Sequence, residues 1–307
     1  DQRYQDLLNR MREGKCTNSD IQLINGRVIG NFSECMDSFS NNRIITPGNE
    51  LVLEINKLFA SYYAQNQNVL VTTAKDRIGN SKLPADLEKM VKNLPATATQ
   101  GLPGELPLYV GMPIFLTKNI AVELGLTNGS TGIIRSIHLQ NGEKVNDVGF
   151  HHVQFKDSDC IVAELDDITV KPLQGLDQNH IPIFPRKESF SLNVKGKKDK
   201  QKKTKKGKKK ALSVKRNHFP IVPRFACTAH KSQGMTLDKA IVDLVPQPNR
   251  KGGIDVSFAY VPLSRVRRLE DLTILRPFDE SVLKVKPNPA CKAMLQHFKA
   301  MDKCKDM

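Results

Sequence analysis

The chain contains no tryptophan, few other aromatic residues and no long hydrophobic run. Phe and Tyr together make up 6% of its 307 residues. No stretch approaches the roughly 18 to 20 consecutive apolar residues that a membrane-spanning helix requires, so the sequence predicts no membrane segment. With 39% hydrophobic and 26% charged residues, the composition is that of an ordinary globular protein. The length allows one large domain or two smaller ones.

Cysteine is sparse and dispersed, and no two cysteines have the close spacing of a metal-binding pair. The six are Cys16, Cys35, Cys160, Cys227, Cys291 and Cys304. In a chain of this length the pattern favours a reduced intracellular compartment and predicts neither a disulfide scaffold nor a zinc site. The adjacent His151 and His152 would point to opposite faces of a strand, which argues against a shared metal. The Gly-x-Ser-x-Gly and His-Glu-x-x-His motifs are also absent.

Acidic residues are the minority, with 32 against 47 Lys and Arg, and the net charge is +15. Most of this excess lies in the run "KGKKDKQKKTKKGKKK" (Lys195–Lys210), whose eleven lysines and one aspartate carry +10. A block of like charges repels itself and stays disordered, and it is typical of segments that bind polyanions or direct a protein to the nucleus. A solvated insertion without a specific partner is the alternative interpretation.

The N-terminal residues predict two short helices. The chain starts "DQRYQDLLNR", with neither an initiator Met nor a signal region, which indicates a piece of a longer protein. Leu7, Leu8 and Met11 share one helical face. Thr17 with Asp20 resembles a variant capping box at the start of the second helix.

An α/β unit follows. The sequence predicts a strand over Arg43–Thr46, a turn at Pro47–Gly48 and then a helix, and strand, tight turn and helix form the repeating unit of an α/β sheet. The same α/β pattern resumes near the C-terminus, where strands are expected in "RFACT", "AIVDLV" and "LTILRP", with a helix in "DVSFAYVPLSR".

Between these two parts the sequence changes to short β-rich runs. They are "LYVGMPIFLTKN", "STGIIRSIHLQNGEK", "HHVQFKD" and "CIVAELDDITVKPL", with Asn128–Gly129 and Asn141–Gly142 as hairpin signals. Several short strands separated by turns predict a small antiparallel barrel. A Pro- and Lys-rich segment follows, and it is expected to be disordered.

Four ordered blocks of sequence between residues 43 and 280 carry a family resemblance. They are "IITPGNELVLEIN", "GMPIFLTKNIAVELGLTNGSTGII", "TAHKSQGMTLDKAIVDL" and "FAYVPLSRVRRLEDLTIL". In this order they resemble motifs of superfamily-one DNA helicases. The nearest branch is the five-prime-to-three-prime one that includes the petite-integration-frequency helicases, RecD and the helicases of helitron transposons.

The resemblance implies an α/β fold, namely the RecA-like second motor domain of a P-loop NTPase with an inserted small β-barrel. The implied organisation is a helical lead-in (1–42), a discontinuous RecA-like domain (43–107 and 213–280), the barrel (108–175), a disordered Pro/Lys-rich insert (176–212) and a C-terminal tail (281–307). ATP and Mg²⁺ would be bound mainly by a first RecA-like domain upstream. The other implied partners are single-stranded DNA and duplex junctions.

The resemblance also assigns roles to individual residues. Arg265 would be an arginine finger on the γ-phosphate of ATP, where a guanidinium stabilises charge on the transferring phosphoryl group. Gln233 and Gly234 would approach the nucleotide, whereas turn chemistry alone is the alternative for the glycine. The backbone of a single strand would lie near Thr228, His230, Lys231, Lys118 and Asn119. Lys118 and Asn119 could equally cap a strand end, and Arg265 could belong to a solvated arginine cluster.

The chain departs from the family in three respects. It has no Gly-x-x-x-x-Gly-Lys-[Ser/Thr] loop to cradle phosphates, so this chain alone should not hydrolyse ATP. Gly48 stands where relatives commonly carry an arginine that serves the nucleotide. Pro262 replaces a small residue one helical turn before Arg265, and a kink there would misdirect the arginine.

Three functions remain open at this stage. The first is the C-terminal motor half of an ATP-dependent DNA helicase, which such families use in replication, recombination, repair and telomere maintenance. The second is a non-catalytic nucleic-acid-binding remnant of a mobile-element helicase. The third, a basic structural or ribosome-associated protein, accounts only for the lysine run. The run favours the nucleus, with the mitochondrion as the alternative. Base stacking would depend on Phe or Tyr residues that the sequence does not locate.

Overall fold

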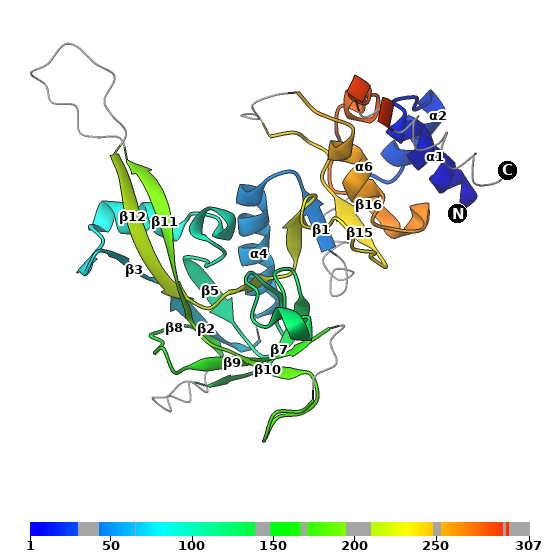
Figure 1. Ribbon diagram of the computed structural model, residues 1–307. Coiled ribbons are helices and arrows are strands. Elements are labelled where there is room, and N and C mark those ends of the chain that lie inside the picture. Colours follow the sequence, from blue (N-terminus) through cyan, green and yellow to red (C-terminus); the bar gives the residue numbers. More distant parts are fainter. Residues whose placement is uncertain are drawn as a thin grey trace, which may run out of the picture. The chain divides into compact units, whose positions relative to one another are not determined.

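The computed structural model describes residues 1–29, 43–64, 66–138, 148–166, 171–194, 210–247, 253–290 and 293–294 (Figure 1). The chain divides into two compact units. The terminal unit combines Asp1–Val52 with Phe225–Met307, and the central unit is Leu53–Arg224. Residues 43–107, expected to belong to one domain, therefore contribute to both units. No helix among the described residues is both long and apolar enough to cross a membrane.

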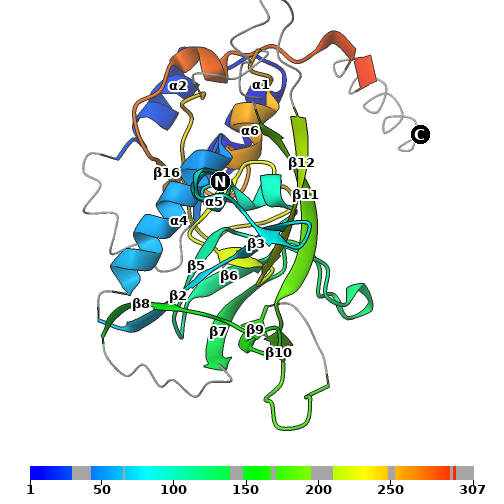
Figure 2. The same cartoon turned by 90° about the vertical axis from the view of Figure 1, so that its left-hand side faces the viewer.

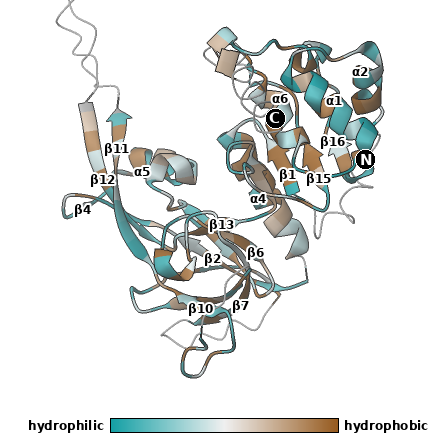
Figure 3. Ribbon diagram, turned by 45° about the vertical axis from the view of Figure 1, so that its right-hand side comes forward, coloured by the Kyte–Doolittle hydropathy of each residue, from teal (hydrophilic) through white to brown (hydrophobic). Residues whose placement is uncertain are grey.

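A parallel four-stranded sheet forms the core of the terminal unit, in the order β14-β1-β15-β16. Its strands are β1 (Arg43–Thr46), β14 (Ala226–Thr228), β15 (Ala240–Val242) and β16 (Leu272–Ile274). All four were predicted. β1 is buried at three of its four positions and β15 at all three, because a parallel sheet is covered on both faces. Figure 3 colours β15 as hydrophobic. Helix α4 (Asn49–Tyr63) starts in this unit, and α6 (Ser257–Leu263) and the 3₁₀ turns η4 (Leu269–Asp271) and η5 (Glu280–Leu283) also belong to it.

The two predicted N-terminal helices are α1 (Gln2–Arg12) and α2 (Asn18–Asn25). The capping box is confirmed, because the Thr17 hydroxyl accepts from the Asp20 amide while the Asp20 carboxylate accepts from the Thr17 amide. Buried Tyr4 ties α1 to α6 by donating its hydroxyl to the Leu263 carbonyl at 2.5 Å.

The central unit is built from three sheets. The antiparallel order β10-β9-β7-β6-β13 contains β6 (Pro113–Leu116), β7 (Thr131–His138), β9 (Cys160–Leu165), β10 (His180–Ile183) and β13 (Ile221–Pro223). Of these strands β6, β7 and β9 were expected, whereas β10 and β13 were not. β10 and β13 are the two ends of this order, so the described residues show an antiparallel sheet and no pairing that closes it into a barrel. A second sheet joins β2 (Asn68–Thr73), β5 (Glu105–Leu108) and β8 (Gly149–Val153).

The third sheet contradicts part of the expected disordered insert. Within 176–212 the structure has β10, β11 (Arg186–Val194) and the start of β12 (Lys210–His218). β11 and β12 pair in antiparallel register over nine residues each and run side by side in Figure 2. Residues 195–209 of the lysine run, like Asn141–Gly142, lie outside the described residues.

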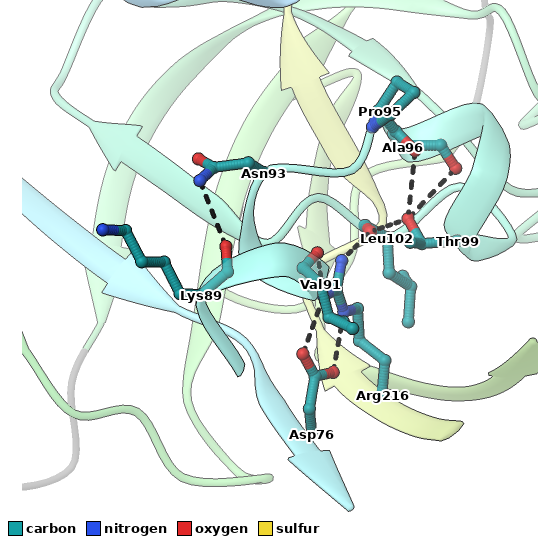
Figure 4. Close-up of polar contacts among 9 residues, drawn as sticks. All are labelled: Asp76, Lys89, Val91, Asn93, Pro95, Ala96, Thr99, Leu102 and Arg216. Carbon is teal, nitrogen blue, oxygen red and sulfur yellow. Dashed lines mark hydrogen bonds and ion pairs between the residues drawn. The ribbon is translucent and has the colours of Figure 1, made fainter. Parts of the chain in front are cut away.

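The hairpin of β11 and β12 is held by an apolar layer and a buried ion pair. The sheet continues through β3 (Lys75–Ile78) and β4 (Ser81–Lys82), and α5 (Ala85–Lys92), followed by η2 (Ala96–Thr99), lies beside it. Val91 of α5 packs with Phe190, Leu192 and Val214 of the hairpin. Fully buried Arg216 then pairs with Asp76 through two hydrogen bonds of 2.7 Å (Figure 4).

Asn128–Gly129 does not form a two-residue hairpin turn. β6 and β7 pair as predicted, but the loop between them is longer and includes the 3₁₀ turn η3 (Val122–Leu124). Gly129 adopts a positive φ of 102° and donates its amide to the Leu116 carbonyl at 2.9 Å. Glycine is therefore favoured here because the backbone at the end of the loop has a positive φ, and not because residues 128 and 129 form a tight turn.

Candidate functional site

A cavity of about 270 Å³ opens in the terminal unit beside the ends of its parallel strands. Thr46 ends β1, Thr228 ends β14 and Asp243 directly follows β15, and all three line the cavity. The chain goes from β1 to β14 on one side and then crosses to β15 and β16 on the other. Ligands of open α/β sheets bind at the carboxyl ends of strands where the order reverses in this way. The full lining is Ile45, Thr46, Pro47, Asn49, Thr228, Ala229, His230, Gln233, Asp243, Ser257, Phe258, Val261 and Pro262.

The loop after β14 supplies three of the predicted site residues to this cavity, namely Thr228, His230 and Gln233. The loop closes on its own strand, since the Ser232 amide donates to the Thr228 carbonyl at 3.1 Å. Gly234 does not line the cavity. It has φ +79°, and a Cβ there would meet nothing within 4 Å, so the left-handed backbone rather than lack of space calls for glycine.

Lys231 lies in the same loop but is half-buried and is not among the cavity-lining residues. Its amide donates to the Thr228 hydroxyl at 3.4 Å. Burial lowers the pKa of the Lys231 ammonium, and burial raises the pKa of the neighbouring Cys227 thiol to about 11. The thiol is therefore inert at neutral pH, which agrees with a structural rather than a reactive cysteine.

Arg265 is bound to its own unit and does not line the cavity. Its Nη1 donates to the carbonyls of Ser232 and Met235 at 3.2 and 3.1 Å. Its Nε donates to the Val261 carbonyl at 2.8 Å, and its Nη2 donates to the Ser264 hydroxyl at 2.7 Å. A guanidinium has five N–H donors, so four are engaged here. This arrangement fastens α6 to the loop after β14.

Two cavity residues that the sequence analysis did not single out are Asp243 and Phe258. Asp243 is 3% exposed, and both its carboxylate oxygens accept from Arg276, at 3.0 and 2.8 Å. A signal for Asp243 was present, since a polar residue directly after a buried parallel strand lies at the edge where ligands bind. Phe258, 8% exposed on α6, had no such signal.

Lys118 and Asn119 lie in the central unit, and both make structural contacts. Lys118 pairs with Glu188 at 2.9 Å, and the Asn119 side chain accepts from the Asn128 amide at 2.8 Å. The second bond lies within the loop between β6 and β7 and does not cap a strand end, which was the alternative interpretation of these residues. Their contact with a nucleic acid stays a prediction.

Gly48 and Pro262, the two positions at which the sequence departs from the family, each have a defined place in the terminal unit. A Cβ built on Gly48 would lie 1.6 Å from Nε2 of Gln247, so the Gln247 amide occupies the space that a side chain at position 48 would take. Pro262 is buried in the last turn of α6, one residue before the helix ends at Leu263. It removes one N–H from that turn and adds its ring to the cavity wall.

The chain's own residues do not fit a complete triphosphate site. Among the thirteen residues of the cavity lining there is no Lys or Arg, and the sequence has no phosphate-binding loop. Across the described ranges, no group of three or more His, Cys, Asp or Glu is placed to hold a metal ion.

The family model and the curated proteins that match this chain all carry the name Pif1. Residues 90–137 match the family "DNA helicase Pif1, 2B domain". The "ATP-dependent DNA helicase PIF1" of Danio rerio is 28% identical over 179 residues, which are 58% of this chain and 20% of that protein. The protein of the same name from Xenopus laevis is 27% identical over 60% of this chain and 21% of its own length.

Solved structures share the fold. The Pif1 helicase of Candida albicans matches with a TM-score of 0.63 and 22% identity, over 98% of this chain and 58% of that one. Bacteroides Pif1 bound to ssDNA matches with a TM-score of 0.61 and 18% identity, over 98% and 55%. The chain spans about a fifth of the curated relatives. The chain is therefore similar to these Pif1 helicases, in sequence over part of its length and in its α/β fold over almost all of it.

Proposed function

We propose that the chain is the C-terminal motor part of an ATP-dependent DNA helicase. The observation that carries this proposal is the cavity at the carboxyl edge of the parallel sheet, which gathers Thr228, His230 and Gln233 from the block "TAHKSQG". The relatives named ATP-dependent DNA helicase PIF1 and the Pif1 structure bound to ssDNA support it.

In this proposal a first RecA-like domain holds most of the ATP and Mg²⁺, and this chain supplies the second face of the nucleotide site. Pif1 from Bacteroides has been solved with ADP-AlF3 and ssDNA, which supports nucleotide and single-strand use in relatives. Arg265 would serve as the finger only after its bonds to Ser232 and Met235 are exchanged for bonds to phosphate. Single-stranded DNA and duplex junctions are the proposed substrates, with five-prime-to-three-prime polarity.

The finer assignments extend this proposal. DNA repair, recombination and telomere maintenance are the processes that suit such a motor. The nucleus is the proposed location, supported by the lysine run at Lys195–Lys210.

The test joins this chain to a Pif1-type first motor domain and measures DNA-stimulated ATP hydrolysis and unwinding. Arg265→Ala is expected to lower the hydrolysis rate by roughly 10³-fold or more, because arginine fingers contribute on that scale. Arg267→Ala, an exposed neighbour, is the matched control and should retain the rate. Circular dichroism of both variants separates loss of catalysis from loss of folding.

A binding-only protein is the second candidate, and two contacts favour it. The neutral amide of Gln247 fills the space beside Gly48, and Arg265 is already bonded to its own unit. If the joined protein binds single strands but shows no hydrolysis that depends on Arg265, this second function replaces the first.

A further inference from the structure

The sheet of β11, β12, β3 and β4 in the central unit has two different faces. One face is covered by α5, and Val91 of that helix packs there with Phe190 and Val214. Arg216 and Asp76 point to the same side, where Arg216 donates to the Val91 carbonyl at 3.0 Å (Figure 4). Successive side chains of a strand point to opposite faces, so the residues next to these in sequence face away from α5.

Three cations lie side by side on the face that points away from α5. Lys215 of β12 is directly opposite Arg77 of β3, and Arg77 is in turn directly opposite Lys82 of β4. All three residues are exposed. Side chains directly opposite each other in antiparallel strands have Cβ atoms about 5 Å apart, so the three positive charges are close neighbours. Arg77, Lys82 and Lys215 are called the basic row below.

The acidic residues of the same strands do not neutralise the basic row. Asp76 and Glu188 both lie directly opposite Arg216 in the register, so they belong to the other face. Asp76 pairs with Arg216, and Glu188 pairs with Lys118 at 2.9 Å. Across the described residues, no carboxylate forms an ion pair with a member of the row. Like charges directly opposite one another repel, so this face carries a concentrated positive potential.

Small hydroxyl side chains continue this face along the hairpin of β11 and β12. Ser189 is directly opposite Lys215, Ser191 is directly opposite Ser213, and all three serines are exposed. Serine hydroxyls, Lys and Arg are groups that contact DNA phosphates. The described positions of this face carry no aromatic ring, so the bases of a single strand would find no stacking surface on it. The face therefore suits a phosphate backbone whose bases are already paired.

We propose that this face of the sheet holds the phosphate backbone of a DNA duplex. The inference rests on the proposed function and adds which surface holds the duplex arm of a junction. Adjacent strands lie about 4.8 Å apart, so Lys215 and Lys82, at the two ends of the basic row, stand about 10 Å apart. Their long side chains can contact phosphates on both sides of a minor groove, which is about 6 Å wide. The serine hydroxyls donate to the same backbone.

The test measures binding of the chain to a DNA duplex of about 16 base pairs, and to a single strand of equal length, by fluorescence anisotropy over a range of salt. The variant combines Arg77→Gln, Lys82→Gln and Lys215→Gln. We expect its duplex affinity to fall roughly 10-fold or more at about 100 mM salt, and the salt slope to fall by about 2 to 3, because each phosphate contact contributes about 0.9. Affinity for the single strand should fall clearly less, because one backbone does not present phosphates on two sides of a groove.

A matched control removes three exposed cations that lie outside the basic row. It combines Lys89→Gln, on the helix that covers the other face of the sheet, with Lys171→Gln and Arg267→Gln, and should keep the duplex affinity of the parent. The lysine run is present in every protein, so it contributes equally throughout. The row variant should unfold thermally at no lower temperature than the parent, because it loses only like-charge neighbours. Equal weakening by the control, or equal losses for duplex and single strand, overturns the duplex surface.

Poly-glutamate at equal charge concentration is the competitor, and displacement of the duplex as effective as that by unlabelled duplex would show a surface for acidic chains in general, which also overturns the inference. Two further results separate this inference from the proposed function. Unchanged duplex binding by the row variant overturns the inference alone, if hydrolysis by the joined protein still depends on Arg265. Duplex binding that depends on the row, without such hydrolysis, retains the surface and overturns the motor.

Discussion

Arg265 and Met235 are separated by thirty residues, yet Nη1 of Arg265 donates a 3.1 Å hydrogen bond to the Met235 carbonyl. The same nitrogen donates to the Ser232 carbonyl at 3.2 Å, so one guanidinium bridges both ends of the segment Ser232–Met235. This segment includes Gln233, which lines the cavity. Arg265 therefore determines where a site residue lies, whatever it does toward a nucleotide.

The first prediction concerns this bridging role. Arg265→Ala leaves three main-chain carbonyls, those of Ser232, Met235 and Val261, without their charged donor and should lower the free energy of unfolding by about 2 kcal/mol. Arg265→Lys should recover only part of this loss, because an ammonium cannot reproduce the planar fork of a guanidinium. Urea denaturation measures both variants. The exposed Arg267→Ala should stay within about 0.5 kcal/mol of the parent, and equal stability of Arg265→Ala and the parent would contradict the bridge.

Local patterns were enough to predict much of the terminal unit. The strand at Arg43–Thr46, the capping box of Thr17 with Asp20 and the helix now seen at Ser257–Leu263 depend on neighbouring residues only. Thr228, His230 and Gln233 were assigned together because the contiguous block that contains them resembles a helicase motif. Such features depend on a few neighbouring residues, so they can be predicted without the tertiary structure.

Other features depend on distant partners and could not be predicted. Phe190 and Leu192 alternate with serines in the manner of a half-buried strand. Their strand pairs with β12, which lies beyond the lysine run. Because 176–212 is rich in Pro and Lys, the sequence predicted disorder there instead of a strand. Phe258 reaches the cavity only because α6 lies beside the carboxyl ends of the parallel strands. The partners of Arg265 are carbonyl oxygens, which have no side-chain signature in a sequence.

The second prediction addresses the buried pair of Arg216 and Asp76 in the central unit. Their side chains are 0% and 7% exposed, and Arg216 also donates to the Val91 and Leu102 carbonyls at 3.0 and 3.1 Å. Asp76→Leu alone should cost about 3 to 5 kcal/mol of unfolding free energy, because it leaves a buried charge unpaired.

The combination of Asp76→Leu with Arg216→Met removes both charges and should cost clearly less than the sum of the single changes. A double-mutant cycle by urea denaturation measures the coupling, with the exposed Lys215→Ala as control. Additive effects of the two substitutions would show that the ion pair contributes little.

The third prediction concerns Gly48 and Gln247. Gly48→Ala should destabilise the protein by about 1 kcal/mol, because its Cβ displaces the Gln247 amide. In a Gln247→Ala background the same change should be neutral or stabilising by about 0.5 kcal/mol, since alanine restricts the unfolded chain more than glycine does. Thermal unfolding of the four proteins in the cycle gives the coupling. Gly48→Arg meets the same amide, so the exposed Gln247 side chain must turn away to admit an arginine. Equal effects of Gly48→Ala in both backgrounds would rule out this steric relationship.

The fourth prediction is a pH dependence that originates in His218. This imidazole is fully buried, its Nε2 lies 3.1 Å from the Thr72 hydroxyl, and burial, followed by the nearby charge of Arg216, lowers its pKa to about 3. Between pH 6.5 and pH 3 the unfolded chain therefore binds a proton that the folded chain does not. The stability contributed by neutral His218 is complete above pH 6.5 and declines as the pH falls through this window, by about 1.4 kcal/mol per pH unit.

The difference between the parent and His218→Gln isolates this contribution from that of the carboxylates. Between pH 6.5 and pH 5 the parent should lose about 2 kcal/mol more unfolding free energy than the variant, although the variant is less stable at neutral pH. His152→Gln, at an exposed position on β8, should keep the slope of the parent. Parallel stability-against-pH curves for the parent and His218→Gln would mean that His218 takes up a proton without unfolding, which a fully buried ring beside Arg216 should not do.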